Sequence, residues 1–302
     1  MQAASFSTSR FNEMEHRVTT SVLDTPRGGE RQRVAFTVVV VLSALFFLVL
    51  LGSAFAVFSP WLAGGGDGPP PGYDDPASHR WHDAQWAAHT GILLGGSLLA
   101  LLWRPLSKPL LIQFLALATV VLAVMTAIGG APENAIVLVP VALVIALYPG
   151  RRALLDLSRT DGFYLPVLAL AVVAALVMAP DAWDKLWLQL DAASGDEHAE
   201  HSHWIGSTLL TINLLVAGVL MATRRPGWRA LGVLLGLAFI YLGGTALTAR
   251  DYLEGVAAIG QWSTVAGVLA LLVGAGYLGL ALASDRLSVI TPRPVGRPRS
   301  AG

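Results

Sequence analysis

The stretch DEHAEHSHW, residues 196–204, holds three histidines and three carboxylates directly before a long apolar run. A related segment, HRWH, residues 79–82, precedes an earlier apolar run. Imidazole and carboxylate groups are ligands of Zn(II), Cu(II), Ni(II) and iron, and two imidazoles can bind haem through its axial positions. The two segments therefore predict a site for a transition metal ion or haem.

One histidine of the candidate set stands apart because it lies inside an apolar run. His82 and His89 are seven residues apart and share a face if this segment is helical. His89 would lie roughly two turns inside a membrane span, where an ionisable side chain normally faces the protein interior. Thr208 takes the corresponding place in the second half. The candidate metal ligands are His79, His82, His89, Glu133, His198, His201 and Glu254.

An interfacial interpretation of the same residues stays open, because an H-x-x-H spacing alone is weak evidence for a metal site. The histidines can lie in the polar head-group region beside a belt of tryptophans. Glu133 and Glu254 each precede an apolar run and can simply complement a helix macrodipole. What favours a ligand site is the recurrence of the two-histidine spacing in both halves of the chain.

The composition places the chain in a bilayer. Of its 302 residues, 54% are hydrophobic and 13% are charged, with a mean hydropathy of +0.61, whereas soluble domains carry about 25% charged residues. The zero net charge argues against nucleic acid as a partner. The absence of cysteine excludes disulfides, thiolate metal sites and a Cys nucleophile. No catalytic motif is found, so enzymatic activity is not predicted.

The predicted fold is an all-α integral membrane protein with eight transmembrane helices, since a span needs roughly 20 apolar residues. The fourth is short and contains Pro140. The predicted spans are residues 34–61, 83–103, 109–128, 134–149, 162–179, 203–223, 228–248 and 256–283. We expect disordered tails at 1–33 and 285–302, four-helix repeats at 34–150 and 162–284, and a linker at 151–161.

The basic residues predict the orientation. They mark the cytoplasmic side, and 17 of the 20 lie in the tails and in the loops that follow the even-numbered spans. The opposite loops hold only Arg80, Lys185 and Arg250. Both termini are therefore predicted to be cytoplasmic, with the histidines outside. The Arg, Ala, Gly and Val bias suggests a bacterial plasma membrane.

The second half repeats the first at a spacing of about 120 residues. Pro60 and Pro180 each stand where the first span of a half is expected to end, and Trp103-Arg104-Pro105 matches Arg224-Arg225-Pro226. Each half begins in the cytoplasm and has four spans, so the repeat is parallel and its axis runs along the membrane normal. Two four-helix bundles side by side are expected.

This topology resembles that of haem A synthase, which also consists of two fused four-helix bundles with paired haem-ligand histidines. That family places the histidines on the second, fourth, sixth and eighth spans. Here span two has His82 and His89 and span six begins at His203, but Glu133 and Glu254 stand where spans four and eight would need histidines. The resemblance therefore implies the topology and not the activity.

Three functions follow from these patterns. The first is an outward-facing metal-binding or haem-binding membrane protein that handles its ligand for a partner. The second is a non-catalytic scaffold or assembly subunit that binds other membrane proteins. The third is a channel or carrier for a small neutral solute. Ion coupling is disfavoured because the mid-membrane polar residues are uncharged apart from His89. They are Gln113, Thr119, Thr126, Thr211, Asn213, Tyr241 and Thr245.

Overall fold

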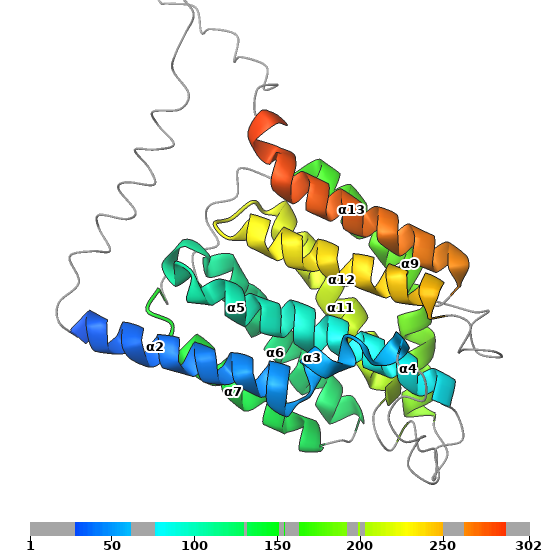
Figure 1. The fold of residues 1–302 in the computed structure, drawn as a ribbon, viewed down its shortest axis with the longest axis horizontal. Coiled ribbons are helices and arrows are strands. Elements are labelled where there is room, and N and C mark those ends of the chain that lie inside the picture. The colour runs from blue at the N-terminus through cyan, green and yellow to red at the C-terminus, as the bar shows by residue number, and fades with distance from the viewer. Residues whose placement is uncertain are drawn as a thin grey trace, which may run out of the picture.

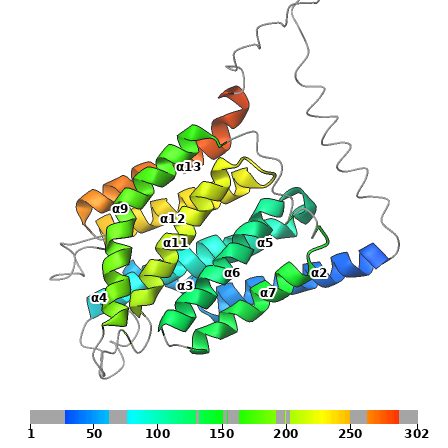
Figure 2. The ribbon, with the colours of Figure 1, turned by 180° about the vertical axis from the view of Figure 1, so that it is seen from behind.

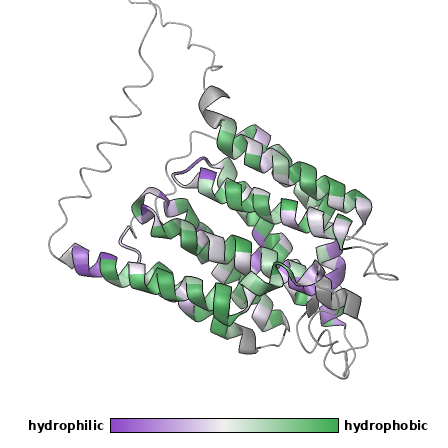
Figure 3. Ribbon diagram, viewed as in Figure 1, coloured by the Kyte–Doolittle hydropathy of each residue, from purple (hydrophilic) through white to green (hydrophobic). Residues whose placement is uncertain are grey.

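The computed structural model describes residues 28–61, 76–129, 132–150, 154, 163–191, 199, 203–249 and 263–287. These ranges contain helices and no strands. Seven helices are long and apolar enough to cross a bilayer, which confirms an all-α polytopic membrane protein. Their apolar residues run along most of their length, and hydrophilic residues gather at the helix ends (Figure 3).

The helical segments follow one another with few breaks. Spans one and two each combine α-helical and π-helical parts. The described elements are α2 (Gly28–Leu45), η1 (Phe46–Leu50), α3 (Ser53–Ala56), η2 (Ser59–Trp61), α4 (Pro76–Trp86), η3 (Ala87–Gly95), α5 (Gly96–Leu102), η4 (Pro105–Ser107), α6 (Pro109–Gly129), η5 (Pro132–Val137), α7 (Leu138–Leu147), α9 (Leu165–Leu190), α11 (His203–Ala222), α12 (Trp228–Thr248) and α13 (Thr264–Leu287).

The helices pack in two groups, α2 to α7 and α9 to α13, and Figures 1 and 2 show them from two opposite sides. In the first group α2 packs against α5 and α7, and α6 packs against α7. In the second group α9 packs against α11 and α13, and α12 packs against α11 and α13. The groups meet where α11 contacts α6 and where α12 contacts η3 and α5. Spans two and six therefore lie at the centre of the molecule.

Burial agrees with this arrangement. In Trp81–Leu102 and in Trp204–Ala222, 67% of an apolar 18-residue window is buried, against 28% of such a window in Gly29–Leu50 and in α9. The outer helices expose large apolar side chains such as Leu50, Leu165 and Leu176. Such a surface is costly in water and suited to lipid. These two central segments also hold most of the buried polar side chains of the described residues.

The first apolar helix ends earlier than predicted. A single span over 34–61 is wrong, because the helix stops at Leu50 and Gly52 takes a left-handed backbone conformation with φ +66°. Glycine adopts this conformation without a Cβ penalty. The chain then continues as α3 and η2, which pack against α4. Pro60 consequently lies in a short 3-10 turn and not at the end of a span.

Helix α9 ends later than predicted. The expected end at Ala179 is wrong, since the helix continues through Pro180 to Leu190. Proline removes one helical hydrogen bond, but transmembrane helices tolerate it where neighbouring groups compensate. The predicted fourth span corresponds to an apolar helix over Ala135–Leu147. At 1.5 Å per residue it measures about 20 Å, less than the roughly 30 Å of a bilayer core.

Candidate functional site

Helices α4 and α11 meet at one end of the molecule, which we call the histidine end. Helix α4 begins at Pro76, so His79 and His82 both lie on it, before the apolar part of span two. The His82 ring packs edge-on against the Trp204 ring, with 5.9 Å between their centroids. Trp204 is the second residue of α11, directly after His203. The start of α4 therefore lies beside the start of α11.

Helix α9 helps to position the same end. The Lys185 ammonium lies 4.3 Å from the centroid of the Trp204 ring, which is within the range of a cation–π interaction. One turn further along, the Gln189 side-chain Nε2 donates a hydrogen bond of 2.9 Å to the Ala199 carbonyl. Ala199 belongs to the DEHAEHSHW segment. Three helices thus converge on the histidine end.

His89 is buried, as its place in span two predicts, and it forms a separate polar site between the bundles. Only 5% of the residue is exposed. Its Nε2 lies 2.8 Å from Nδ2 of Asn213 on α11. An amide nitrogen only donates, so His89 accepts through Nε2 and holds its proton on Nδ1. The seven residues from His82 to His89 rise roughly 10 Å along a helix, which separates this pair from the histidine end.

Other hydrogen bonds surround the His89–Asn213 pair. Gln85 Oε1 accepts from the Ser207 hydroxyl at 2.7 Å, one turn nearer the histidine end. The hydroxyls of Ser53 and Thr90 lie 2.6 Å apart. Both contacts are buried. They join span two to α11 and to the short helix α3.

The backbone around His89 departs from a regular α-helix. Residues Ala87–Gly95 form a π-helix with His89 inside it. Segments of π-helix are rare and are frequently found at functional sites. The Asn213 Oδ1 atom is buried and has no hydrogen-bond partner in the described part of the chain. The region therefore combines an unusual backbone with a polar atom whose hydrogen-bonding capacity is unused.

Much of the predicted ligand set lies outside the described residues. This applies to His198, His201 and Glu254, and to the side chains of His79 and Glu133. Among the described residues there is no group of three histidines or carboxylates able to hold a metal ion. His82 and His89, the two members with described side chains, point to different partners.

No family model matches this chain, and no curated protein or solved structure is significantly similar to it. Its function must therefore be argued from its own residues.

Sequence reasoning recognised Asn213 as a mid-membrane polar residue but did not pair it with His89. It also did not single out Gln85, Ser207 or Ser53. The available signal was an isolated polar residue within an apolar run, since such residues usually bind across helices. Choosing the partner required knowing that spans two and six are adjacent.

Proposed function

We propose that this membrane protein binds a transition metal ion or haem at its histidine end, with ligands from both halves of the chain. The observation that carries the proposal is the contact between His82 and Trp204. It brings the helix that carries His79 and His82 beside the start of α11, and His198 and His201 come shortly before α11 in the sequence. Neither segment alone supplies as many imidazoles.

The local geometry supports the proposal in two ways. His79 and His82 are three residues apart on α4, so they share a helix face. Gln189 holds the carbonyl of Ala199, which lies between His198 and His201 in the sequence. Metal–imidazole bonds of about 2.0–2.1 Å then require the two segments to close on one centre. Glu133 and Glu254 are proposed as carboxylate ligands at the same membrane level.

The test is the metal content and the visible spectrum of the purified protein. The double variant His82→Ala, His201→Ala should lose bound metal or haem and still insert into the membrane. His16→Ala, which changes a histidine in the N-terminal tail, is the control and should retain full occupancy. Unchanged metal content in the double variant would refute the site and favour the interfacial interpretation of the histidines.

We further propose that the two bundles arose by duplication and that Ala135–Leu147 serves as the fourth of eight spans. The order of helix neighbours is the same in both groups. The turns after spans two and six each contain an arginine with positive φ, Arg104 at 50° and Arg224 at 52°. This conformation is uncommon outside glycine. Pro60 lies in a short 3-10 turn whereas Pro180 lies inside α9, which counts against the equivalence of the two prolines. Superposition of 34–149 on 162–283 by a rotation near 180° tests the proposal.

The proposed orientation places the histidine end outside the cell. Arg104, Lys108, Arg224 and Arg225 lie in the turns that follow α5 and α11, at the opposite end of the spans. A reporter fused after Gly302 should be active only in the cytoplasm, and one inserted at Gly66 only outside. The reverse pattern at either position would overturn this orientation.

A further inference from the structure

Two arginines lie around one tryptophan at the end of the molecule opposite the histidine end. The guanidinium carbons of Arg224 and Arg229 lie 5.5 and 5.6 Å from the centroid of the Trp228 ring. Arg224 also lies 5.1 Å from the centroid of the Tyr164 ring. These distances are within the range of cation–π interactions. Both arginines are exposed, whereas Trp228 is buried, and we call these four residues the arginine–tryptophan site.

The backbone holds this site in place. The Tyr164 N–H donates a hydrogen bond of 2.8 Å to the Ala222 carbonyl, so the start of α9 is joined to the end of α11. Arg224 comes two residues after Ala222, with a left-handed backbone at φ 52°. A residue other than glycine keeps this conformation only where its surroundings impose it, and such residues cluster at functional sites. The backbone from which the Arg224 side chain projects is therefore set by the fold.

The charge around this site is positive along the sequence and not only among the described residues. Residues 203–249, which form α11, α12 and the turn between them, include three arginines and no acidic residue. Segments 1–27, 151–162 and 284–302 continue the chain from the helix ends on this side, and together they contain ten basic and six acidic residues. Their composition therefore adds to the positive charge instead of cancelling it. An anion is the ligand that this end favours.

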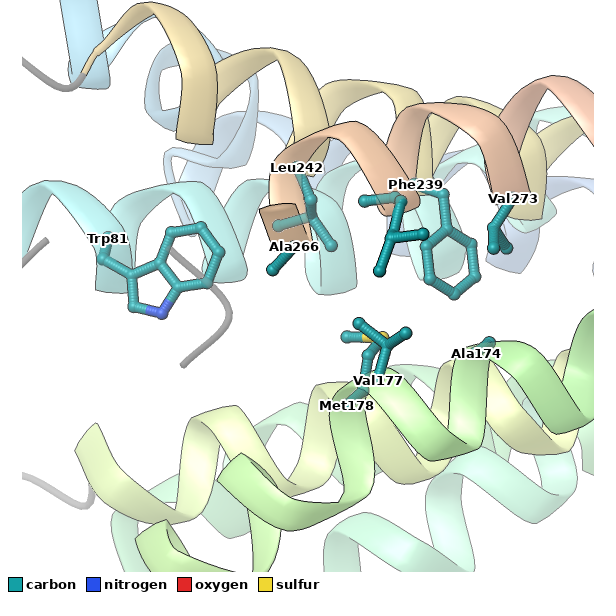
Figure 4. Close-up of a pocket in the computed structure, with 10 residues that line it drawn as sticks. Trp81, Ala174, Val177, Met178, Phe239, Leu242, Ala266 and Val273 are labelled. Atoms are coloured by element: carbon teal, nitrogen blue, oxygen red, sulfur yellow. The ribbon is translucent and has the colours of Figure 1, made fainter. Parts of the chain in front are cut away.

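The site borders the surface that α9 presents to lipid. Phe163 and Leu165, on either side of Tyr164, are exposed apolar residues of a chain segment at the start of a spanning helix. The cavity behind α9, where Met178 points toward Phe239 in Figure 4, has a volume of only about 20 Å³. That is room for about one water molecule and not for an acyl chain. Acyl chains beside the arginines therefore lie on the outer side of α9.

We propose that the arginine–tryptophan site binds the phosphate group of an anionic membrane lipid. The planar guanidinium of Arg224 donates two N–H hydrogen bonds to the phosphate oxygens, and Arg229 adds a second positive charge. The acyl chains lie against Phe163 and Leu165. Basic sites between transmembrane helices bind head groups of this class. The site lies at the opposite end of the molecule from the proposed metal site and does not depend on it.

The test is native mass spectrometry of the full chain with added phosphatidylglycerol, and with phosphatidylcholine of the same acyl chains. The wild type should bind phosphatidylglycerol several-fold more tightly, because the choline cation is repelled by the arginines. Arg224→Gln should weaken phosphatidylglycerol binding about tenfold, which is typical of a lost charge-assisted hydrogen bond. Arg31→Gln removes one exposed positive charge at the start of α2, on the same side, and is the matched control. It should leave the affinity nearly unchanged.

Three further arms test the geometry, the source of the phosphate and the folding of the variants. Arg224→Lys keeps the charge without the planar group and should bind with intermediate affinity. Inorganic phosphate lacks acyl chains and should not displace the lipid. Arg224→Gly serves if the glutamine variant does not fold, because glycine adopts a positive φ without strain, and it should lose binding equally. Equal losses for Arg224→Gln and Arg31→Gln, equal binding of the two lipids, or displacement by inorganic phosphate would overturn the proposal.

Discussion

The first group of helices, α2 to α7, and the second group, α9 to α13, have the same order of helix contacts and different interiors. The first is filled by large side chains, and Phe36, Phe47, Phe114 and Tyr148 are almost completely buried there. Phe36 and Tyr148 meet edge-on at 5.6 Å. The second group also buries Phe239 and Tyr277, but glycines on α12 and α13 bring the backbones of these two helices into close contact. The two groups thus differ in how closely their last two helices approach each other.

The largest expected effect comes from removing an aromatic ring from the packed bundle. Phe114→Ala should lower the free energy of unfolding by about 3–5 kcal/mol, because the ring is fully buried and its neighbours cannot collapse into the space. Phe58→Ala removes an exposed ring and is the control. Titration with SDS in mixed micelles measures both. A loss for Phe114→Ala as small as that of the control would show that the first bundle is loosely packed.

The next prediction concerns the contact that shapes the second bundle. Gly274→Ala places a methyl group 2.8 Å from the Gly236 carbonyl oxygen, so α12 and α13 must separate. The expected loss is about 1–3 kcal/mol of unfolding free energy, which is typical of overpacking. Gly279→Ala on the same helix meets nothing within 4 Å and should not destabilise the protein. Equal effects of the two changes would contradict the close backbone approach.

A matched pair of substitutions tests the contrast between the interiors directly. Ala118 on α6 and Ala174 on α9 are both buried, at 3% and 2% exposure. Ala118→Leu should overpack the first bundle and cost about 1–3 kcal/mol. Ala174→Leu should cost less than Ala118→Leu, because a cavity of about 20 Å³ beside Ala174 takes up part of the added side chain. The difference between the two thermal midpoints is the measurement, and a larger loss for Ala174→Leu would reverse the assignment.

The sequence was a good guide to helices and a poor guide to their interruptions. Hydropathy predicted the ends of α6 and α12 to within a residue or two. Charged or turn residues bound each of these apolar runs, so the positions at which the helix can begin and end are few. It missed the break at Gly52 and the passage of α9 through Pro180. Both residues are compatible with either outcome, and packing against neighbouring helices decides between them.

The candidate site was likewise predictable from the sequence only in part. The burial of His89 followed from the cost of an exposed imidazole within a span. Its partner Asn213 did not follow, since that choice depends on which helices adjoin and on the phase of the π-helix Ala87–Gly95. The remaining metal ligands stay a prediction from their spacing in the sequence. The structural observation that supports them is the ring contact between His82 and Trp204.

The smallest predicted effect lies at the contact between the two bundles, in the His89–Asn213 hydrogen bond. Side-chain hydrogen bonds between membrane helices contribute about 0.6 kcal/mol on average and up to about 1.7. Asn213→Leu leaves the imidazole buried without its partner, and His89→Phe leaves the amide without one. The double variant should therefore lose less unfolding free energy than the sum of the losses of the two single variants. The coupling energy from SDS titration of the four proteins should fall within that range. The Thr119 hydroxyl donates a hydrogen bond to the Leu115 carbonyl of its own helix, so His89→Phe with Thr119→Val should show no coupling. A coupling energy near zero for His89 and Asn213 would mean that this hydrogen bond does not help to hold the two groups of helices together.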